Sequence, residues 1–202
     1  MTPNVGTTTT RTRILTAATD LFGVRGVDAV SLDLIAAEVG VAKQTLLYWF
    51  PSKDELLQAV LAQAAAELGV VIEAAVRASP DEPLERIEAV VRAVFRPAVR
   101  RPALLGLVRE VSRLAPPVSD ELTSQLRPLA DRAKAFLEAE MQRGRLRRAD
   151  PGLVAALCYA TVTGIATEPE ALRVTGWQPT TAGLRHLRDE LLAFLRAALA
   201  PS

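Results

Sequence analysis

The sequence contains little that could hold a metal ion, a disulfide or a catalytic base. It has one cysteine, Cys158, and one histidine, His186, in 202 residues. A single cysteine excludes an internal disulfide and the zinc-ribbon and iron–sulfur spacings, and a single histidine excludes histidine-rich metal sites and proton relays. A phosphate-binding loop and a glycine-rich dinucleotide turn are also absent. We therefore expect no cofactor, no metal and no enzyme activity.

Aromatic residues are also scarce, because only 9 residues are Phe, Trp or Tyr, whereas 34 are alanine. Alanine is the best helix former and a poor strand residue, so the composition favours an all-α fold. Half of the residues are hydrophobic and 23% are charged, which is typical of a folded globular chain. The length corresponds to one large domain or two small ones.

The chain has no large excess of charge of either sign. Its formal net charge is +1, and residues 1–50 carry four basic and four acidic side chains. A uniform basic field is therefore absent, so any nucleic-acid surface on this protein must be local.

Long hydrophobic runs are limited to one charge-free stretch, residues 151–167, which has 17 residues. This length is at the lower limit of a membrane span, and the stretch contains three threonines, two glycines and a proline. We therefore expect a buried helix rather than a span. The N-terminus has neither the basic start nor the apolar core of a signal peptide, so we expect a cytoplasmic protein.

The N-terminal part of the sequence predicts a polar, disordered tail over residues 1–10 and a helical domain over residues 11–53. Thr10 is expected to cap the first helix. One buried face of that helix is predicted by the spacing of Ile14, Ala18, Leu21 and Phe22. Gly26 is expected to end it, and Ser31 to cap a second, short helix.

Residues 32–50 have the pattern of two short helices that meet at a tight turn. Gly40 supplies the positive φ that such a turn requires, and Ala36 is small enough for the helices to cross closely. The side chains expected to fill the space between the helices are Ile35, Val39, Val41, Leu46 and Trp49. This spacing is typical of a DNA-binding helix–turn–helix, whose second helix enters the major groove.

The later helix of this unit begins at about Lys43, and its face opposite Leu46 is expected to be exposed to solvent. A glutamine such as Gln44 can pair with adenine, and a lysine such as Lys43 can donate to guanine or phosphate. Lys53 begins the next helix and can reach the phosphate backbone. The candidate DNA-binding residues are therefore Lys43, Gln44, Thr45, Tyr48 and Lys53.

The region 54–202 is predicted to be helical throughout. The sequence Ser52-Lys53-Asp54-Glu55 has the form of a capping box and opens a long helix to about Ala78. Prolines then separate further helices, predicted at 84–96, 103–114, 119–146, 151–167, 171–175 and 181–199, with Pro116–Pro117 in a loop. Asp150 is expected to cap the helix 151–167.

A pattern of apolar, small and capping residues extends from Arg11 to Leu56. Its members are Arg11, Ile14, Leu15, Ala17, Ala18, Leu21, Phe22 and Gly26, then Ser31, Leu32, Ile35, Ala36, Gly40, Val41, Lys43, Thr45, Leu46, Phe50, Ser52, Lys53, Glu55 and Leu56. This pattern resembles the N-terminal domain of the TetR family of transcriptional regulators. The chain departs from the family at Ala42, where serine is usual, and at Leu47, where tyrosine is usual. Both family residues commonly contact phosphate.

The resemblance implies a homodimer with two helix–turn–helix heads, each reading one half of a near-palindromic operator. It also implies a small-molecule effector that binds in the C-terminal domain, residues 54–202, and releases the protein from DNA, as a repressor does. The long helix 53–78 connects the two domains and is expected to act as a lever between them.

The dimer interface is expected on the apolar helices near 151–167 and 181–199, because two helices from each subunit make a four-helix bundle. Candidate residues of the effector pocket are Phe95, Leu104, Leu107, Val108, Phe136, Met141, Tyr159 and Trp177, whose apolar character favours a lipophilic effector. One alternative stays open: a helical interaction or ligand-sensing protein that keeps the helix–turn–helix as a scaffold without binding DNA. Salt-dependent affinity for DNA distinguishes the two.

Overall fold

The computed structural model describes residues 9–100, 103–111, 118–167, 169–178 and 180–201. Within these ranges the fold is all-α, as the composition predicts, and no strand is present. The helices are α1 (Thr10–Arg25), α2 (Leu32–Val39), α3 (Lys43–Trp49), α4 (Lys53–Ala78), α5 (Pro83–Arg100), α6 (Ala103–Val111), α7 (Val118–Gln142), α8 (Pro151–Thr167), α9 (Pro169–Val174) and α10 (Thr181–Leu199). The predicted loop at Pro116–Pro117 and most of the predicted tail lie outside the described residues.

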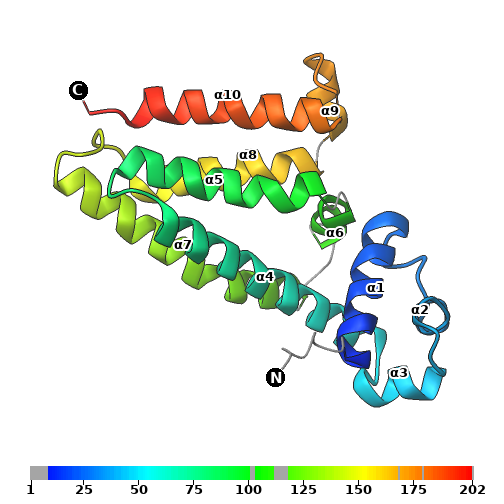
Figure 1. Cartoon of the computed structure of the whole chain (residues 1–202). Helices are drawn as coiled ribbons and strands as arrows, with labels where there is room; N and C mark the ends of the chain where they lie inside the picture. Colours follow the sequence, from blue (N-terminus) through cyan, green and yellow to red (C-terminus); the bar gives the residue numbers. More distant parts are fainter. Residues whose placement is uncertain (1–8, 101–102, 112–117, 168, 179, 202) are drawn as a thin grey trace, which may run out of the picture.

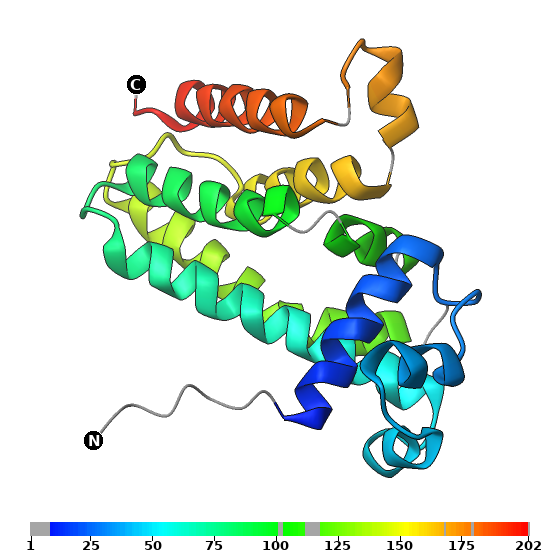
Figure 2. The same cartoon turned by 45° about the vertical axis from the view of Figure 1, so that its right-hand side comes forward.

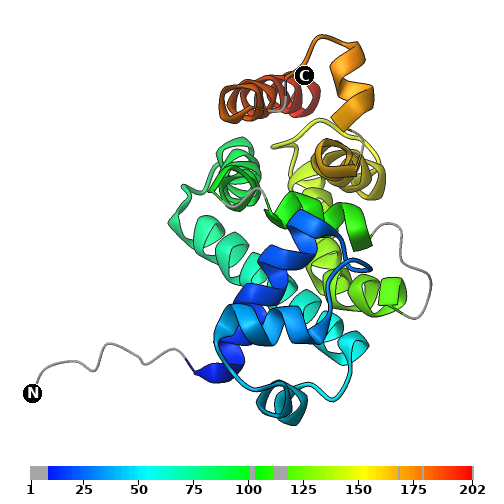
Figure 3. The same cartoon turned by 90° about the vertical axis from the view of Figure 1, so that its right-hand side faces the viewer.

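The helices form a small head, α1 to α3, and a larger body, α4 to α10 (Figure 1). The long helix α4 starts under the head and runs along the body. Within the body, α10 lies over α5 and α8, and these two lie over α4 and α7 (Figure 3). The head therefore projects from one end of a layered helical body.

Two apolar clusters hold the fold together. The head cluster joins α1, α2 and α3 with the first turns of α4, and it includes Phe22, Ile35 and Leu46, each with 0% of its surface exposed. The body cluster combines α5, α7 and α10 through residues such as Phe95 and Met141. Burial of apolar surface stabilises each cluster at roughly 25 cal/mol per Å² removed from water.

The most extensive contact between two helices in the described residues joins α1 of the head to α6 of the body (Figure 2). Glycines at the crossing let the two backbones touch. A Cβ atom on Gly106 would lie 1.8 Å from the carbonyl oxygen of Gly23, and one on Gly23 would lie 2.0 Å from the carbonyl oxygen of Ala103. Since Cβ atoms never approach that closely, neither position accepts a side chain unless the helices move apart.

A hydrogen bond at the end of α1 adds to this contact between α1 and α6, which we call the α1–α6 joint. The helix ends at Gly26, which has φ 83°, as the sequence predicts. Directly after it, the backbone N–H of Val27 donates to Oε2 of Glu110 in α6 at 3.1 Å. Helix α6 therefore holds the C-terminal end of α1 through both its backbone and a side chain.

Predictions about helix ends are wrong at several places. The helix predicted over 119–146 already ends at Gln142. The sequence predicts an end near Arg96, but α5 continues through Pro97 to Arg100. A proline inside a helix removes one backbone hydrogen bond, and α5 has enough other turns to continue past it. The cap of α1 is Thr9 rather than Thr10, since Thr9 Oγ1 accepts from the backbone N–H of Thr12 at 3.2 Å.

The prediction that residues 151–167 form a buried helix is also wrong for the single chain. Asp150 caps α8 as predicted, with Oδ1 accepting from the N–H of Gly152 at 2.8 Å. However, Leu153 and Leu157 are 64% and 65% exposed, and Tyr159 is 59% exposed. One face of the apolar run therefore lies on the surface of the monomer, while Val154, Ala155 and Cys158 pack against the body cluster.

Among the described helices, α4 is the one long and apolar enough to span a membrane by length and composition. This is weak evidence, because helices of soluble domains pass the same test. Helix α4 packs against α1, α5 and α7, and its Leu56, Leu57, Val60 and Leu61 are buried in the head cluster. We therefore describe it as the connecting helix of a folded domain.

Candidate nucleic-acid interface

Local signals in the sequence form the α2–α3 unit as predicted. Ser31 caps α2, with its Oγ accepting from the backbone N–H of Leu34 at 3.2 Å. Gly40 ends α2 in the left-handed conformation, at φ 73° and ψ 39°, and the N–H of Val41 then donates to the carbonyl of Ala36 at 3.0 Å. The turn is therefore held by backbone bonds and by the one residue type that adopts this conformation freely.

The burial of α3 differs from the prediction at its last residue. Leu46 is fully buried as expected, but Trp49 is 41% exposed. Helix α3 ends at Trp49, and the backbone then becomes extended at Phe50, which is 3% exposed and enters the head cluster instead. Phe50 therefore takes the core position that the helical spacing assigned to Trp49.

The exposed part of α3 carries the predicted DNA-binding residues. Lys43, Gln44, Thr45 and Tyr48 are all exposed, and Tyr48 is the most open of the large side chains there, at 79%. The ring of Tyr48 meets that of Trp49 edge to face, with centroids 5.3 Å apart. These four polar side chains thus share a short helix whose opposite side is fixed in the core.

Lys53 is placed next to this surface, at the start of α4. Ser52 caps that helix, with its Oγ accepting from the N–H of Glu55 at 3.1 Å. Lys53 is half-buried, and its Nζ donates to the carbonyl of Asp28 at 3.5 Å, which is a long contact. The structure therefore places all five sequence-predicted residues within the head or at its junction with α4.

Ala42, one of the two departures from the family pattern, is the N-cap of α3 and makes no side-chain capping bond. Ser31 and Ser52 supply such bonds to α2 and α4. Replacing a serine cap by alanine costs about 0.5–2 kcal/mol. The start of α3 is therefore weaker than the starts of its neighbours. Leu47, the other departure, is half-buried.

The sequence analysis missed one contact of a candidate DNA-binding residue. Nζ of Lys43 lies 2.7 Å from Oδ2 of Asp33, an ion pair between the first turns of α3 and α2. Asp33 lies in the first turn of α2 and is not among the candidate residues of the sequence analysis. The two partners are ten positions apart in the sequence and the turn lies between them, so their contact depends on the crossing of the helices and not on a local spacing.

The structure separates the candidate residues of the effector pocket. Phe95 and Met141 lie in the body cluster, with Phe136 and Trp177 packed against it. Leu107 belongs to the head cluster. Val108 and Tyr159 are exposed, at 38% and 59%, and Leu104 is half-buried. Four of the eight candidates therefore share one apolar region, and four do not.

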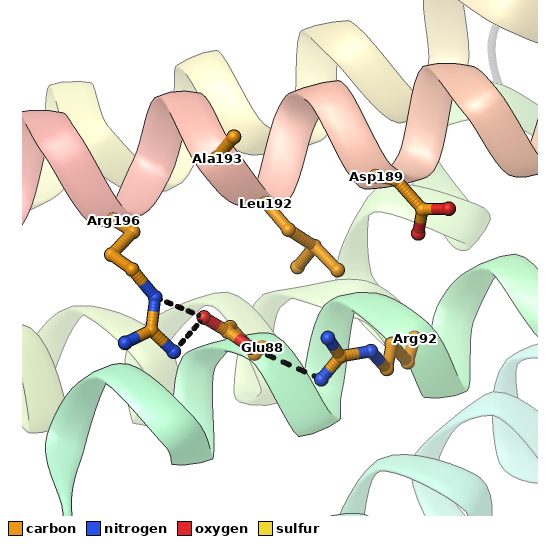
Figure 4. A pocket seen from close by; sticks show the side chains of 6 residues that line it. All are labelled: Glu88, Arg92, Asp189, Leu192, Ala193 and Arg196. Carbon is orange, nitrogen blue, oxygen red and sulfur yellow. Dashed lines mark hydrogen bonds and ion pairs between the residues drawn. The ribbon is translucent and has the colours of Figure 1, made fainter.

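A groove of about 400 Å³ lies between α5 and α10 (Figure 4). It is lined by Glu88, Arg92, Asp189, Leu192, Ala193 and Arg196, none of which is a predicted pocket residue. At its floor Glu88 accepts from Arg92 at 3.1 Å and from Nε of Arg196 at 2.8 Å. The groove therefore contains an ion-pair network that fastens α10 to α5.

The remaining reactive side chains show no sign of a chemical site. Burial raises the pKa of the Cys158 thiol, which keeps it protonated and weakly nucleophilic. His186 is exposed on α10. In the part of the chain that the structure describes, no cluster of three or more His, Cys, Asp or Glu side chains could hold a metal ion.

Residues 14–60 match the family described as bacterial regulatory proteins, tetR family. The HTH-type transcriptional regulator RutR of Escherichia coli strain K12 is 33% identical over 167 residues, which cover 81% of this chain and 77% of RutR. Among solved structures, a transcriptional regulator from Saccharomonospora viridis in complex with choline has a TM-score of 0.79 at 22% identity, covering 95% of this chain and 98% of that one. The ketosteroid transcriptional regulator KstR2 of Mycobacterium tuberculosis has a TM-score of 0.74 at 21% identity, covering 98% of each chain.

Proposed function

Because the chain belongs to the TetR family of bacterial transcriptional regulators, we propose that it acts as a homodimeric repressor whose heads bind DNA through α3. It is a transcriptional regulator and not an enzyme, and regulators of this family bind DNA and small-molecule effectors. The observation that carries the proposal is the two-sided character of α3, with Leu46 fully buried and Tyr48 79% exposed. In this assignment residues 11–53 form the DNA-binding unit, and residues 54–202 form the effector-binding and dimerisation unit.

The exposed side chains of α3 divide into two roles. Gln44 reads a base, because its amide can pair with adenine at two points, and Thr45 and Tyr48 support this contact from neighbouring positions. Lys43 and Lys53 contact phosphates and fix the position of the head on the duplex. The 3.5 Å contact from Lys53 to a carbonyl is weak enough for a phosphate to replace it.

The dimer interface of the proposal uses α8 and α10. Leu153 and Leu157 follow each other by one helical turn on α8, and both are more than 60% exposed, as is Phe194 on α10. Large apolar side chains grouped in this way favour a protein partner rather than water. A second copy of the chain would cover them in a self-complementary four-helix bundle. Two heads held by such a dimer would read a near-palindromic operator.

The effector of the proposal is a small lipophilic molecule that binds in the body. The support is the apolar region where Phe95, Phe136, Met141 and Trp177 gather. An effector regulates only if it prefers one arrangement of the heads. Helix α4 and the α1–α6 joint connect the body to the head, so they are the elements through which that preference would act. We place the protein in the cytoplasm, where its DNA is.

The test is selection from a random DNA pool with the purified protein, followed by mobility-shift titration of the enriched sequence at two salt concentrations. We expect an inverted repeat, bound by a dimer, with affinity that falls steeply as salt rises. A titration with lipophilic compounds on the same DNA then tests for release. Absence of enrichment at every salt concentration would reject DNA binding.

The division of roles has its own test in two substitutions. Lys53→Ala should weaken binding to every duplex alike, whereas Gln44→Ala should relax discrimination at one base pair by about 1–3 kcal/mol. The measurement is competition between the selected operator and variants of it with single base changes. Equal losses for both substitutions on every duplex would contradict this division.

A second function is favoured by one observation, the pairing of Lys43 with Asp33, which neutralises a cation on the proposed DNA surface. The head would then be a scaffold for interaction or ligand sensing without DNA. In that case the purified protein would show no salt-dependent binding to any duplex.

A further inference from the structure

Lys43 is the sole source of positive charge in a long part of the head. Between Arg25 and Lys53 the sequence contains no other basic residue, whereas it contains the acidic residues Asp28, Asp33 and Glu38. A protein that binds a phosphate backbone gains affinity from each cation that neutralises a phosphate. The state of Lys43 therefore has a large influence on how strongly α2 and α3 attract DNA.

In the structure, the ammonium group of Lys43 forms an ion pair with a carboxylate of the same chain. Nζ of Lys43 lies 2.7 Å from Oδ2 of Asp33, and the side chains are 47% and 64% exposed. Asp33 lies in the first turn of α2, two residues after the cap Ser31. A negative charge is favourable at a helix N-terminus, so Asp33 is stable there without its partner. Because the pair is open to water, it contributes little to folding and can be exchanged.

We propose that Asp33 is an internal competitor of DNA, which holds Lys43 in the free protein and lowers the affinity for every duplex. This inference rests on the proposed DNA-binding function of α3. When DNA binds, one of two things must happen. Either a phosphate displaces the carboxylate of Asp33 from Lys43, or the phosphate binds Lys43 while the negatively charged carboxylate remains next to it. In both cases the pair brings no net positive charge to the DNA. The pair therefore releases no counter-ion, in contrast to a free lysine.

The consequence concerns the part of the affinity that is common to all DNA sequences. Contacts to phosphate strengthen binding to random DNA, whereas contacts from Gln44 to a base do not. By cancelling the charge of Lys43, Asp33 reduces the sequence-independent part of the binding and leaves base reading by α3 unchanged. The head would then spend less time on non-operator DNA.

The experiment compares Asp33→Asn with Glu38→Gln in the full-length protein. Both substitutions remove one negative charge from α2, but Glu38 is exposed and has no ion pair among the described residues. The measurement is the dissociation constant for the selected operator and for a random duplex, between 50 and 200 mM salt. Circular dichroism and thermal melting verify that each variant folds.

We expect Asp33→Asn to tighten binding to both duplexes by about three- to tenfold at the lowest salt, and to steepen the salt dependence by about one counter-ion. Glu38→Gln should leave the slope unchanged and tighten binding less. In a Lys43→Gln background, Asp33→Asn should have no more effect than Glu38→Gln, because the lysine that it releases is gone.

Three results would overturn the inference. The first is an unchanged affinity and slope for Asp33→Asn when the parent protein binds DNA, which leaves the proposed function intact. The second is an equal gain in the Lys43→Gln background, which would mean that Asp33 repels DNA without acting through Lys43. The third is the absence of binding in both the parent and Asp33→Asn, which rejects the DNA-binding function as well.

Discussion

The head and the body differ in how completely they bury their apolar side chains within one chain. The head cluster is complete within one chain, with Ile14, Phe22 and Leu46 all at 0% exposure. The body leaves Leu153 and Leu157 of α8 largely exposed. A core closed within one chain needs only its own sequence to fold, whereas an apolar face on the surface needs a partner. The head cluster is thus closed within one chain, with Leu107 of α6 and the first turns of α4 included, and the exposed face of α8 supports the proposed dimer.

The two regions also differ in how they use charge. The body contains two buried carboxylates, Glu88 and Glu140, at 8% and 2% exposure. Glu88 is paired with Arg92 and Arg196, and Glu140 with Arg143 and Arg145. The head cluster has no buried acidic residue in the part of the chain that the structure describes. The head cluster thus depends on apolar packing, while the body adds ion pairs to buried carboxylates.

The largest effect is expected from opening the head cluster. Phe22→Ala removes a fully buried ring and should lower the free energy of unfolding by about 3–5 kcal/mol. Urea unfolding followed by circular dichroism measures the loss. Val24→Ala, two residues away and 75% exposed in the parent, is the control and should cost little. Equal losses for both would contradict the view that the head is held by its own core.

The next effect concerns the exposed face of the body. Leu157→Glu should raise the dissociation constant of the dimer by at least about 30-fold, because it places a charge in a buried, apolar interface. Sedimentation equilibrium at several concentrations measures this. Val174→Glu on α9 starts from a side chain that is 89% exposed and should leave the dimer intact. If Leu157→Glu stays dimeric, another surface forms the interface.

A smaller effect should separate two glycine-to-alanine substitutions of opposite sign. Gly106→Ala would force α6 away from α1 and should cost about 1–3 kcal/mol. Gly69→Ala in α4 meets only a side-chain methyl at 3.9 Å and should stabilise by about 0.5–1 kcal/mol, because alanine favours the helix. Thermal melting of both variants reports the signs. A stabilising Gly106→Ala would show that α1 and α6 are not in close backbone contact at the glycines.

The smallest effect is the pH dependence that the body owes to Glu140. Its pKa is lowered from the ordinary value of 4.5, chiefly by the hydrogen bond from Arg145. A lowered pKa in the folded state stabilises the protein above pH 4.5, and this contribution is lost as the pH falls below that value. Glu140→Gln should therefore lose less stability than the parent as the pH falls from pH 5 to below pH 4 in urea unfolding. Glu138→Gln, on the exposed side of α7, should behave as the parent does.

The sequence predicted the head well because its signals are local. Ser31, Gly40 and Ser52 act within one turn of their own position, and each occupies the predicted place. The four polar residues of α3 are exposed as the helical spacing predicts. The prediction failed at Trp49, where the backbone leaves the helix and Phe50 enters the core. The helical spacing of apolar residues does not reveal that the backbone changes direction at the last residue of the helix.

Contacts between distant segments could not be predicted from the sequence, for a physical reason. The Lys43–Asp33 pair and the contact of Gly23 with Gly106 depend on how helices cross, which no local spacing records. The apolar run 151–167 was predicted correctly as a helix but wrongly as a buried one, because hydrophobicity alone does not distinguish a core within one chain from a surface for a partner. The separation of the pocket candidates, of which only four share the apolar region of the body, has the same origin.

The glycine crossing of α1 and α6 has a consequence for protein engineering. Regulators are often recombined by joining the reader of one to the sensor of another at the start of the connecting helix. Here such a chimera would press residues Gly23 and Val27 against a foreign α6 that lacks Gly106 and Glu110. The portable unit of this protein is therefore discontinuous, and it consists of the head together with α6. A functional exchange must carry both pieces or rebuild the crossing.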